Sequence, residues 1–172
     1  MRKLFCCLLA VVMLLAFIGC TSDAPTKETG VGGNTTSAVK KEDTFGLNDT
    51  AVFKDLKFTA TEIKQTNGVE FFEPEEGNVF VGVKFTIENT SNEEQTISSI
   101  LLFEGYVDDV KCEYSISAAC AFEETLDGSL APGKKLIGWY ALEVPEGWKT
   151  IELNVQSNWL SNSSANFVFE NK

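Results

Sequence analysis

The stretch Val79–Asn89, with the sequence VFVGVKFTIEN, decides the fold of this chain. Its apolar and polar residues alternate, so an extended strand would carry Val79, Val81, Val83, Phe85 and Ile87 on one face and Gly82, Lys84, Thr86 and Glu88 on the other. A repeat of two residues is typical of a half-buried β-strand, whereas a helix would scatter the same apolar residues around its axis. The stretch therefore predicts a half-buried strand.

Similar segments lie on both sides of this strand. Strands are expected at Thr50–Lys54, Leu56–Lys64, Gln95–Glu104, Tyr106–Tyr114 (with a turn at Asp108-Asp109), Lys135–Val144, Thr150–Gln156 and Asn166–Glu170. Clusters rich in Gly, Pro, Asn and Asp separate them, as turns do. Residues 115–126 fit either a short helix or a loop. Because short strands dominate, the sequence predicts an all-β, immunoglobulin-like antiparallel β-sandwich over residues 46–172.

The first nineteen residues have the pattern of a signal peptide. Arg2 and Lys3 precede an apolar run to Ile18, and Gly19-Cys20 follows. A basic start, an apolar stretch and a small residue at the cut are typical of a secretory signal, and Phe17-Ile18-Gly19-Cys20 resembles a lipobox. The run of about fifteen residues is shorter than the roughly 20 that span a bilayer. We therefore expect cleavage after residue 19 and lipid on Cys20, rather than an uncleaved anchor or an ordinary secretory signal.

The segment after Cys20 is polar. Residues 21–44 are mainly Thr, Ser, Gly, Asn, Lys, Glu and Asp, with almost no large apolar side chain. Such a composition buries too little surface to offset the entropy of ordering. Residues 20–45 are therefore predicted to be a lipidated Cys followed by a flexible linker, with a reach near 25–30 Å. The expected location is extracytoplasmic, with the lipid anchoring the protein to the bacterial cell membrane.

Charge and composition exclude several classes of function. The formal net charge is −11, and cleavage would also remove Arg2 and Lys3. An acidic chain is unsuited to nucleic acid, which needs basic surface to displace counterions. The chain has no histidine, so Ser-His-Asp and Cys-His catalysis in their common forms are absent, as is the commonest metal ligand. We expect no catalytic residues, no cofactor and no metal site.

The cysteines sort by position. Of the five, Cys6 and Cys7 leave with the signal peptide and Cys20 takes lipid, which leaves Cys112 and Cys120 in the folded domain. Two cysteines in an exported domain fit one disulfide, and we predict that these two are bonded. The alternative is two free thiols.

Acidic clusters form the next set of candidates. Glu73, Glu75 and Glu76 lie together, and Asp108 adjoins Asp109. A calcium site needs several oxygen ligands converging on one point, and this spacing matches no EF-hand loop. We interpret both clusters as solvated loops. A glycosidase would need two carboxylates across a cleft, and nothing in the sequence selects such a pair.

Aromatic residues are the remaining candidates for binding. Trp139, Tyr140, Trp148 and Trp159 occur in the second half of the chain. Exposed aromatics stack on sugars or anchor protein partners, whereas buried ones fill the core. Alternation places Trp139 and Tyr140 on opposite faces of one strand, so one of them is expected to face outward. Trp139 and Trp148 are the weak binding candidates, and core filling is the alternative.

Several of these residues also form a family pattern. The matching motifs are Val81-x-Val83-x-Phe85-x-Ile87-x-Asn89-x-Ser91, Gly128-x-Leu130-x-Pro132-Gly133, Gly138 and Leu142-x-Val144-Pro145. Over roughly residues 46–156 the chain resembles the bacterial lipoprotein domains of unknown function that have an immunoglobulin-like fold, related to a mycobacterial secreted immunoprotective antigen. The resemblance implies the fold and supplies no catalytic or binding residue. It does not require Cys112 or Cys120.

The expected function is therefore a non-enzymatic binding or interaction module, displayed on a tether in the cell envelope. Its partner is expected to be an envelope protein or a glycan. One alternative is an enzyme or enzyme accessory that acts on carbohydrate or cell wall through carboxylates. Another is a structural envelope protein without a discrete ligand.

Overall fold

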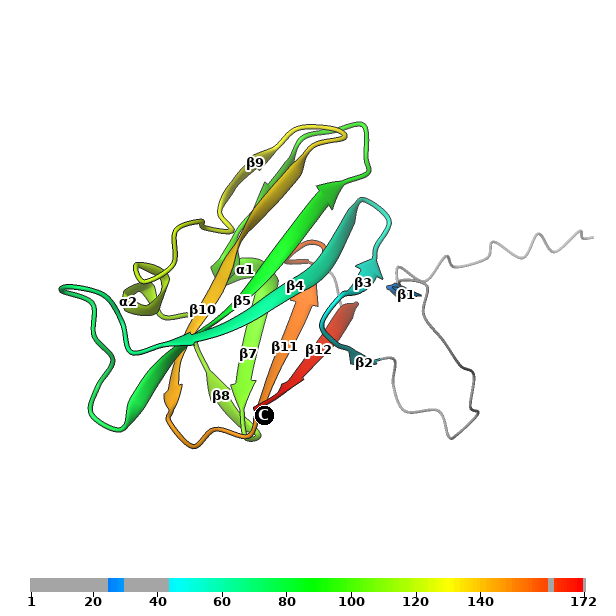
Figure 1. The fold of residues 1–172 in the computed structure, drawn as a ribbon. Coiled ribbons are helices and arrows are strands. Elements are labelled where there is room, and N and C mark those ends of the chain that lie inside the picture. Colours follow the sequence, from blue (N-terminus) through cyan, green and yellow to red (C-terminus); the bar gives the residue numbers. More distant parts are fainter. Residues whose placement is uncertain (1–24, 30–43, 161–162, 172) are drawn as a thin grey trace, which may run out of the picture.

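The computed structural model describes residues 25–29, 44–160 and 163–171, so the predicted signal peptide and Cys20 lie outside the described residues. Two five-stranded sheets face each other (Figure 1). One has the strand order β1 (Thr26–Thr29), β3 (Asp49–Val52), β4 (Leu56–Thr66), β5 (Asn78–Asn89) and β10 (Lys135–Pro145). The other has the order β2 (Thr44–Phe45), β12 (Ser164–Glu170), β11 (Thr150–Gln156), β7 (Phe103–Val107) and β8 (Val110–Cys112). The prediction of an immunoglobulin-like β-sandwich is confirmed.

The smaller elements complete the chain. Strands β6 (Gln95–Ile97) and β9 (Gly128–Leu130) form a two-stranded sheet, and the short helices are α1 (Ser99–Leu102) and α2 (Ile116–Ala119). Strand pairs are antiparallel except for β12 with β2. Within the described ranges, no helix is long and apolar enough to cross a membrane.

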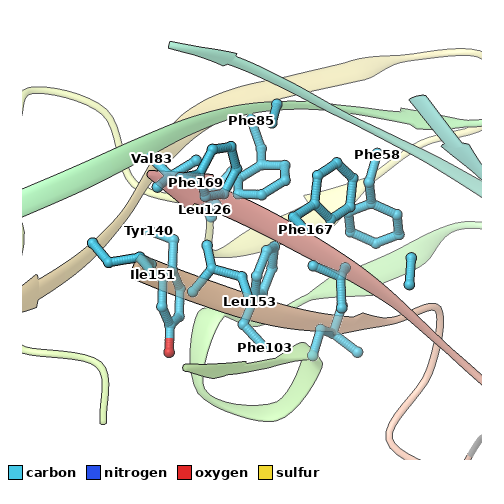
Figure 2. Close-up of a cluster of buried hydrophobic side chains, with 14 of the residues drawn as sticks. Phe58, Val83, Phe85, Phe103, Leu126, Tyr140, Ile151, Leu153, Phe167 and Phe169 are labelled. Carbon is cyan, nitrogen blue, oxygen red and sulfur yellow. The ribbon is translucent and has the colours of Figure 1, made fainter. Parts of the chain in front are cut away.

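The predicted central strand is β5. It pairs with β4 on one side and β10 on the other, and its five alternating apolar residues are all buried. Their side chains meet an aromatic core supplied by both sheets (Figure 2). The ring centroid of Phe85 lies 5.2 Å from that of Phe103 and 5.2 Å from that of Phe167. Because edge-to-face aromatic pairs add about 0.5–1.5 kcal/mol beyond area burial, these rings hold the two sheets in register.

The outer face of β5 and β10 is covered as well. Trp139 faces outward from β10, as alternation allows, but Phe122 stacks on it with a centroid distance of 4.9 Å. The indole Nε1 donates to Glu124 Oε2 at 3.1 Å, and the Lys84 ammonium lies 5.3 Å from the ring centroid. The outer face is therefore a second, smaller core rather than open surface, because Phe80 and Ala118 are also buried in it.

Residues 115–126 are the segment that provides this cover. They contain the one-turn helix α2, whose N-cap Ser115 accepts a hydrogen bond from the Ala118 amide, followed by turns. The backbone amides of Ser115 and Trp139 bond to Ala141 O at 2.9 Å and Glu124 O at 3.0 Å, so the segment occupies the free edge of β10. The segment is therefore partly helix and partly loop, so each of the two predicted alternatives is correct for part of it.

The prediction of a flexible linker over residues 20–45 is wrong in part. Thr26–Thr29 is strand β1, which pairs with β3 at the edge of the sheet, and Lys27 bridges to Asp49 with an N–O distance of 2.6 Å. Phe45, placed by prediction just outside the domain, is 2% exposed and packs on Phe167 with ring centroids 5.1 Å apart. Ordered structure therefore begins before residue 46.

Two other predicted segments differ in detail. The run Gln95–Glu104 divides into β6, α1 and the start of β7, and β9 forms where only a turn was expected. The predicted turn at Asp108-Asp109 is confirmed between β7 and β8, and both residues have positive φ, 47° and 67°. Positive φ at both central residues is what a type I′ hairpin turn requires.

Gly82→Ala tests the packing on the outer face. The added Cβ would lie 2.6 Å from Phe122 Cζ and 2.9 Å from Trp139 Cε3. We expect a loss of about 1–3 kcal/mol in the free energy of unfolding, the usual cost of overpacking, measured by urea denaturation. Gly147→Ala is the matched control, since nothing lies within 4 Å of its added Cβ. Adding Phe122→Ala to Gly82→Ala should reduce the loss in the free energy of unfolding, because the ring that the added Cβ would meet is removed. An undiminished loss in this double variant would contradict the packing.

Candidate binding site

A groove opens where the β8 edge of one sheet meets the β10 edge of the other. Its volume is about 450 Å³. It is lined by α1, by the β7–β8 hairpin, by Tyr114, by Ile116 of α2, by Tyr140, and by Asn154 and Gln156 of β11. We call it the Tyr140 groove, after the residue at its base.

Tyr140 is the most informative residue of the groove. It is 2% exposed, and its ring stacks on Phe103 with centroids 5.0 Å apart. Figure 2 shows the hydroxyl oxygen pointing away from the other labelled rings. Across the described residues, no hydrogen bond to this hydroxyl is found, although Tyr140 lines the groove. Among the described residues, the fully buried side-chain oxygen or nitrogen without a hydrogen-bond partner is Asn166 Oδ1 and not the Tyr140 hydroxyl, so this hydroxyl is accessible from the groove.

The environment keeps this phenol protonated. Burial raises the pKa of Tyr140 well above its ordinary value, and the neighbouring Cys112 and Tyr114 raise it further. The pKa of Tyr114 is also raised, mainly by burial. At neutral pH the Tyr140 hydroxyl is therefore a neutral hydrogen-bond donor facing the groove.

The rim of the groove is apolar. Ile100 and Leu101 of α1 are 67% and 58% exposed, and Ile116 of α2 is 70% exposed. Single exposed aliphatic residues are common on protein surfaces, but several around one hollow mark a contact site. A ligand that fills the groove would therefore bury apolar surface as well as reach the phenol.

One wall of the groove is charged. Lys111 and Glu104 form an ion pair with an N–O distance of 3.2 Å, and both side chains are more than 40% exposed. Exposed pairs of this kind contribute little to stability. Together with Glu113, which also lines the groove, they give the rim a slightly acidic character.

The predicted disulfide is not formed. Cys112 and Cys120 are free thiols in the structure. Cys112 ends β8, and its Sγ donates to Glu143 O on β10 at 3.4 Å, whereas Cys120 is exposed at the C-terminal end of α2. Burial, followed by the charges of Glu143 and Glu113, raises the pKa of the Cys112 thiol. The two cysteines therefore have separate surroundings, and Cys112 is part of the Tyr140 groove.

Neither predicted tryptophan is an exposed stacking surface. Trp139 is 7% exposed beneath Phe122, and Trp148 is 4% exposed. The Trp148 Nε1 donates to Gln65 Oε1 at 3.1 Å, which closes the end of the sandwich between β4 and the β10–β11 turn. Trp148 lines a second, more open hollow of about 670 Å³ between β4 and β12. For both residues the structure therefore supports the core-filling alternative.

The acidic clusters remain separate from the groove. Asp108 accepts hydrogen bonds from the backbone amides of Lys149 and Thr150 at 3.0 and 2.8 Å, so its role is to tie the β7–β8 turn to β11. Glu73, Glu75 and Glu76 are exposed in the β4–β5 loop. Among the residues that the structure describes, no group of three or more His, Cys, Asp or Glu side chains is arranged to hold a metal ion.

Solved structures from several bacteria share this fold. The chain is similar to ycdA of Bacillus subtilis, described as a candidate lipoprotein, with a TM-score of 0.57 and 15% identity over 67% of this chain. The match spans about a third of the ycdA chain, 36%. An uncharacterized β-sandwich protein of Clostridium difficile 630 matches with a TM-score of 0.50 and 13% identity, over 80% of this chain and 100% of that one. At such identities the likeness shows the fold alone.

A third similar structure is a conserved hypothetical protein of Bacillus anthracis, with a TM-score of 0.52 and 14% identity over 71% of this chain and 94% of that one. No functionally curated protein matches the chain in sequence. Residues 45–165 match the domain of unknown function DUF4352. That match covers nearly the whole sandwich, and the chain therefore belongs to the DUF4352 family.

Proposed function

We propose that this chain is a cell-envelope lipoprotein that presents a non-enzymatic β-sandwich binding module, with the Tyr140 groove as its binding site. The observation that supports this most is the Tyr140 hydroxyl, which is accessible from a groove bordered by exposed aliphatic residues although the rest of its side chain is buried. A hydrogen bond that replaces one made to water contributes about 0.5–1.5 kcal/mol net. A ligand that brings an acceptor atom to this hydroxyl would gain that contribution.

The chemistry of the groove favours a peptide segment of an envelope protein. A peptide offers both a backbone carbonyl to accept from Tyr140 and an aliphatic side chain to pack against Ile100, Leu101 and Ile116. A glycan is the other candidate, but sugars bind best against exposed aromatic faces. Trp139 and Trp148 offer no such face, and Trp159, although 65% exposed, does not line the groove.

The envelope location rests on the sequence. The signal-like residues 1–19 precede Cys20, and acyl chains on that cysteine would tether the protein outside the cytoplasm. The likeness to ycdA, a candidate lipoprotein, agrees with this location. The relation to the mycobacterial antigen group stays a prediction from the motifs.

An enzyme that uses carboxylates is the competing class. In this groove it would have to use Glu104 and Glu113, the carboxylates that line it. Glu104 already pairs with Lys111, and an acid–base role would require one of these acids to hold a proton near neutral pH. Turnover of a cell-wall substrate that is lost in Glu104→Gln would overturn the binding-module proposal.

Tyr140→Phe tests the groove directly. The probe is a detergent extract of the producing cell's envelope, and the bait is the mature chain with Cys20→Ser to keep it soluble. Removing the hydroxyl removes one hydrogen bond, so we expect about 5- to 10-fold weaker retention of whatever binds, measured by titrated pull-down and calorimetry. Tyr106→Phe is the matched control, since Tyr106 lies outside the groove lining. Equal losses in both variants, or none in either, would refute this site.

Alkaline titration tests the state of the phenol. Because folding raises the pKa of Tyr140, the folded chain holds this proton more tightly than the unfolded chain, whose tyrosines titrate near pH 10. Its contribution to stability is therefore complete below about pH 10 and is lost as the pH rises above that value. Urea denaturation at stepped pH should show a decline that is smaller in Tyr140→Phe. Identical declines in the two chains would show that the phenol is not shielded.

Cys20→Ala tests the anchor. We expect the wild-type chain in the membrane fraction, with mass spectrometry finding its mature N-terminus acylated at Cys20. The variant should lose the lipid, because the thiol is the acylation site, and leave the membrane fraction. A variant that remains equally membrane-bound would contradict lipid anchoring.

A further inference from the structure

The β4–β5 loop presents a bulky aromatic side chain at its end. Residues 69–72, called here the Phe71 tip, form a turn in which the Val69 amide donates to Phe72 O and the Phe72 amide donates to Val69 O, both at 2.9 Å. Phe71 is 89% exposed, Val69 is 45% exposed and Phe72 is 39% exposed. Figure 1 shows this loop projecting beyond the neighbouring strands. The tip is therefore an apolar surface set apart from the sandwich.

The backbone at Phe71 is strained. Its φ is 72°, in the left-handed region. A turn with positive φ at its third residue usually has Gly or Asn there, because a larger side chain crowds its own backbone. An aromatic residue at this position costs stability and gains nothing from burial, since the ring lies in solvent. Such strain is concentrated at sites of function.

The tip is nevertheless held in place. Gly68 has a φ of 93°, and a Cβ on it would lie 2.2 Å from Phe72 O, so only glycine allows this closure. On the other side of the loop, Glu143 of β10 accepts from the Glu75 amide at 2.7 Å and from Asn78 Nδ2 at 3.1 Å. These contacts restrain the loop on both sides of Phe71. A preordered aromatic anchor loses little entropy when it binds.

The negative charges around the Phe71 tip indicate which kind of partner would bind it. Glu70, Glu73, Glu75 and Glu76 are all exposed in this loop, and none of them forms an ion pair with another described residue. We propose that the Phe71 tip is a second interaction surface, independent of the Tyr140 groove, which inserts Phe71 into an apolar pocket of a protein partner whose rim carries Lys or Arg. Aromatic anchors at the centre of a contact, with complementary charge around them, are the common arrangement of a protein interface.

The same charges disfavour two other occupants. An anionic membrane surface repels a tip surrounded by carboxylates. A second copy of this chain has a formal net charge of −11, and its Tyr140 groove is lined by Glu104 and Glu113 against Lys111 alone. Membrane insertion and self-association are therefore outcomes that would overturn the proposal.

Site-specific cross-linking tests it in the intact lipoprotein. The photoreactive variant Phe71→p-benzoylphenylalanine is compared with the same replacement at Ile137, which is 49% exposed on β10. The protein cross-linked at position 71 is identified by mass spectrometry and purified. Its affinity for the mature chain with Cys20→Ser is then measured at low and high salt. Flotation with phosphatidylcholine vesicles and with vesicles containing phosphatidylglycerol runs alongside.

The proposal predicts a particular pattern. Phe71→Ala should weaken binding of the purified partner at least about 30-fold, as expected for an anchor residue. Glu70→Lys should weaken it and reduce its dependence on salt. Phe71→Gly should also lose binding without lowering the melting temperature, because glycine tolerates the positive φ, which separates lost contact from lost folding. Ile137→Ala should leave affinity unchanged.

Any of the following results would overturn the proposal: no cross-link above the Ile137 control, a cross-link only between copies of this chain, flotation that depends on Phe71, or a partner whose affinity is the same with Phe71→Ala. A cross-linked band alone does not support it, since the affinity pattern is the criterion. The result is separate from the Tyr140 groove, because Tyr140→Phe should leave this affinity unchanged.

Discussion

The contact between Phe122 and Trp139 above Gly82 is the constraint on which the arrangement of this molecule depends. The inner face of β5 and β10 closes an ordinary sandwich core, but their outer face would remain an apolar surface without cover. Phe122 covers it from a segment that also bonds along the free edge of β10. A side chain at Gly82 would leave no room for that ring, so the missing side chain keeps residues 115–126 in their place.

This cover determines which aromatic side chains are exposed and which line the groove. The covering segment removes Trp139 from solvent. Ile116 at its start and the preceding Tyr114 lie beside the base of the groove. The Tyr140 ring belongs to the core, whereas its hydroxyl lies at the boundary where three segments distant in the sequence meet. Within the sandwich, the proposed binding function therefore depends on a polar atom at the margin of the core rather than on an exposed aromatic ring.

The parts of this structure that depend on local periodicity could be predicted from the sequence. The alternation of apolar and polar residues in β5 and β10 is visible in the sequence, and so is the placement of Trp139 and Tyr140 on opposite faces of β10. Strand β1 could not be predicted in this way, because its residues are polar and it is ordered by the edge of β3 and by the pair of Lys27 with Asp49. The groove could not be predicted for a similar reason: it forms where residues far apart in the sequence pack together, and no spacing of residues encodes it.

The central claim is that ligands enter the Tyr140 groove, and Cys112 allows a direct measurement because its thiol lines that groove. The measurement is the alkylation rate of Cys112 by iodoacetamide in the mature chain carrying Cys20→Ser and Cys120→Ser, with and without envelope extract. We expect the extract to slow alkylation in this chain and to have a much weaker effect when Tyr140→Phe is added. An alkylation rate that the extract leaves unchanged, under conditions where binding is detected, would show that the ligand binds outside the Tyr140 groove.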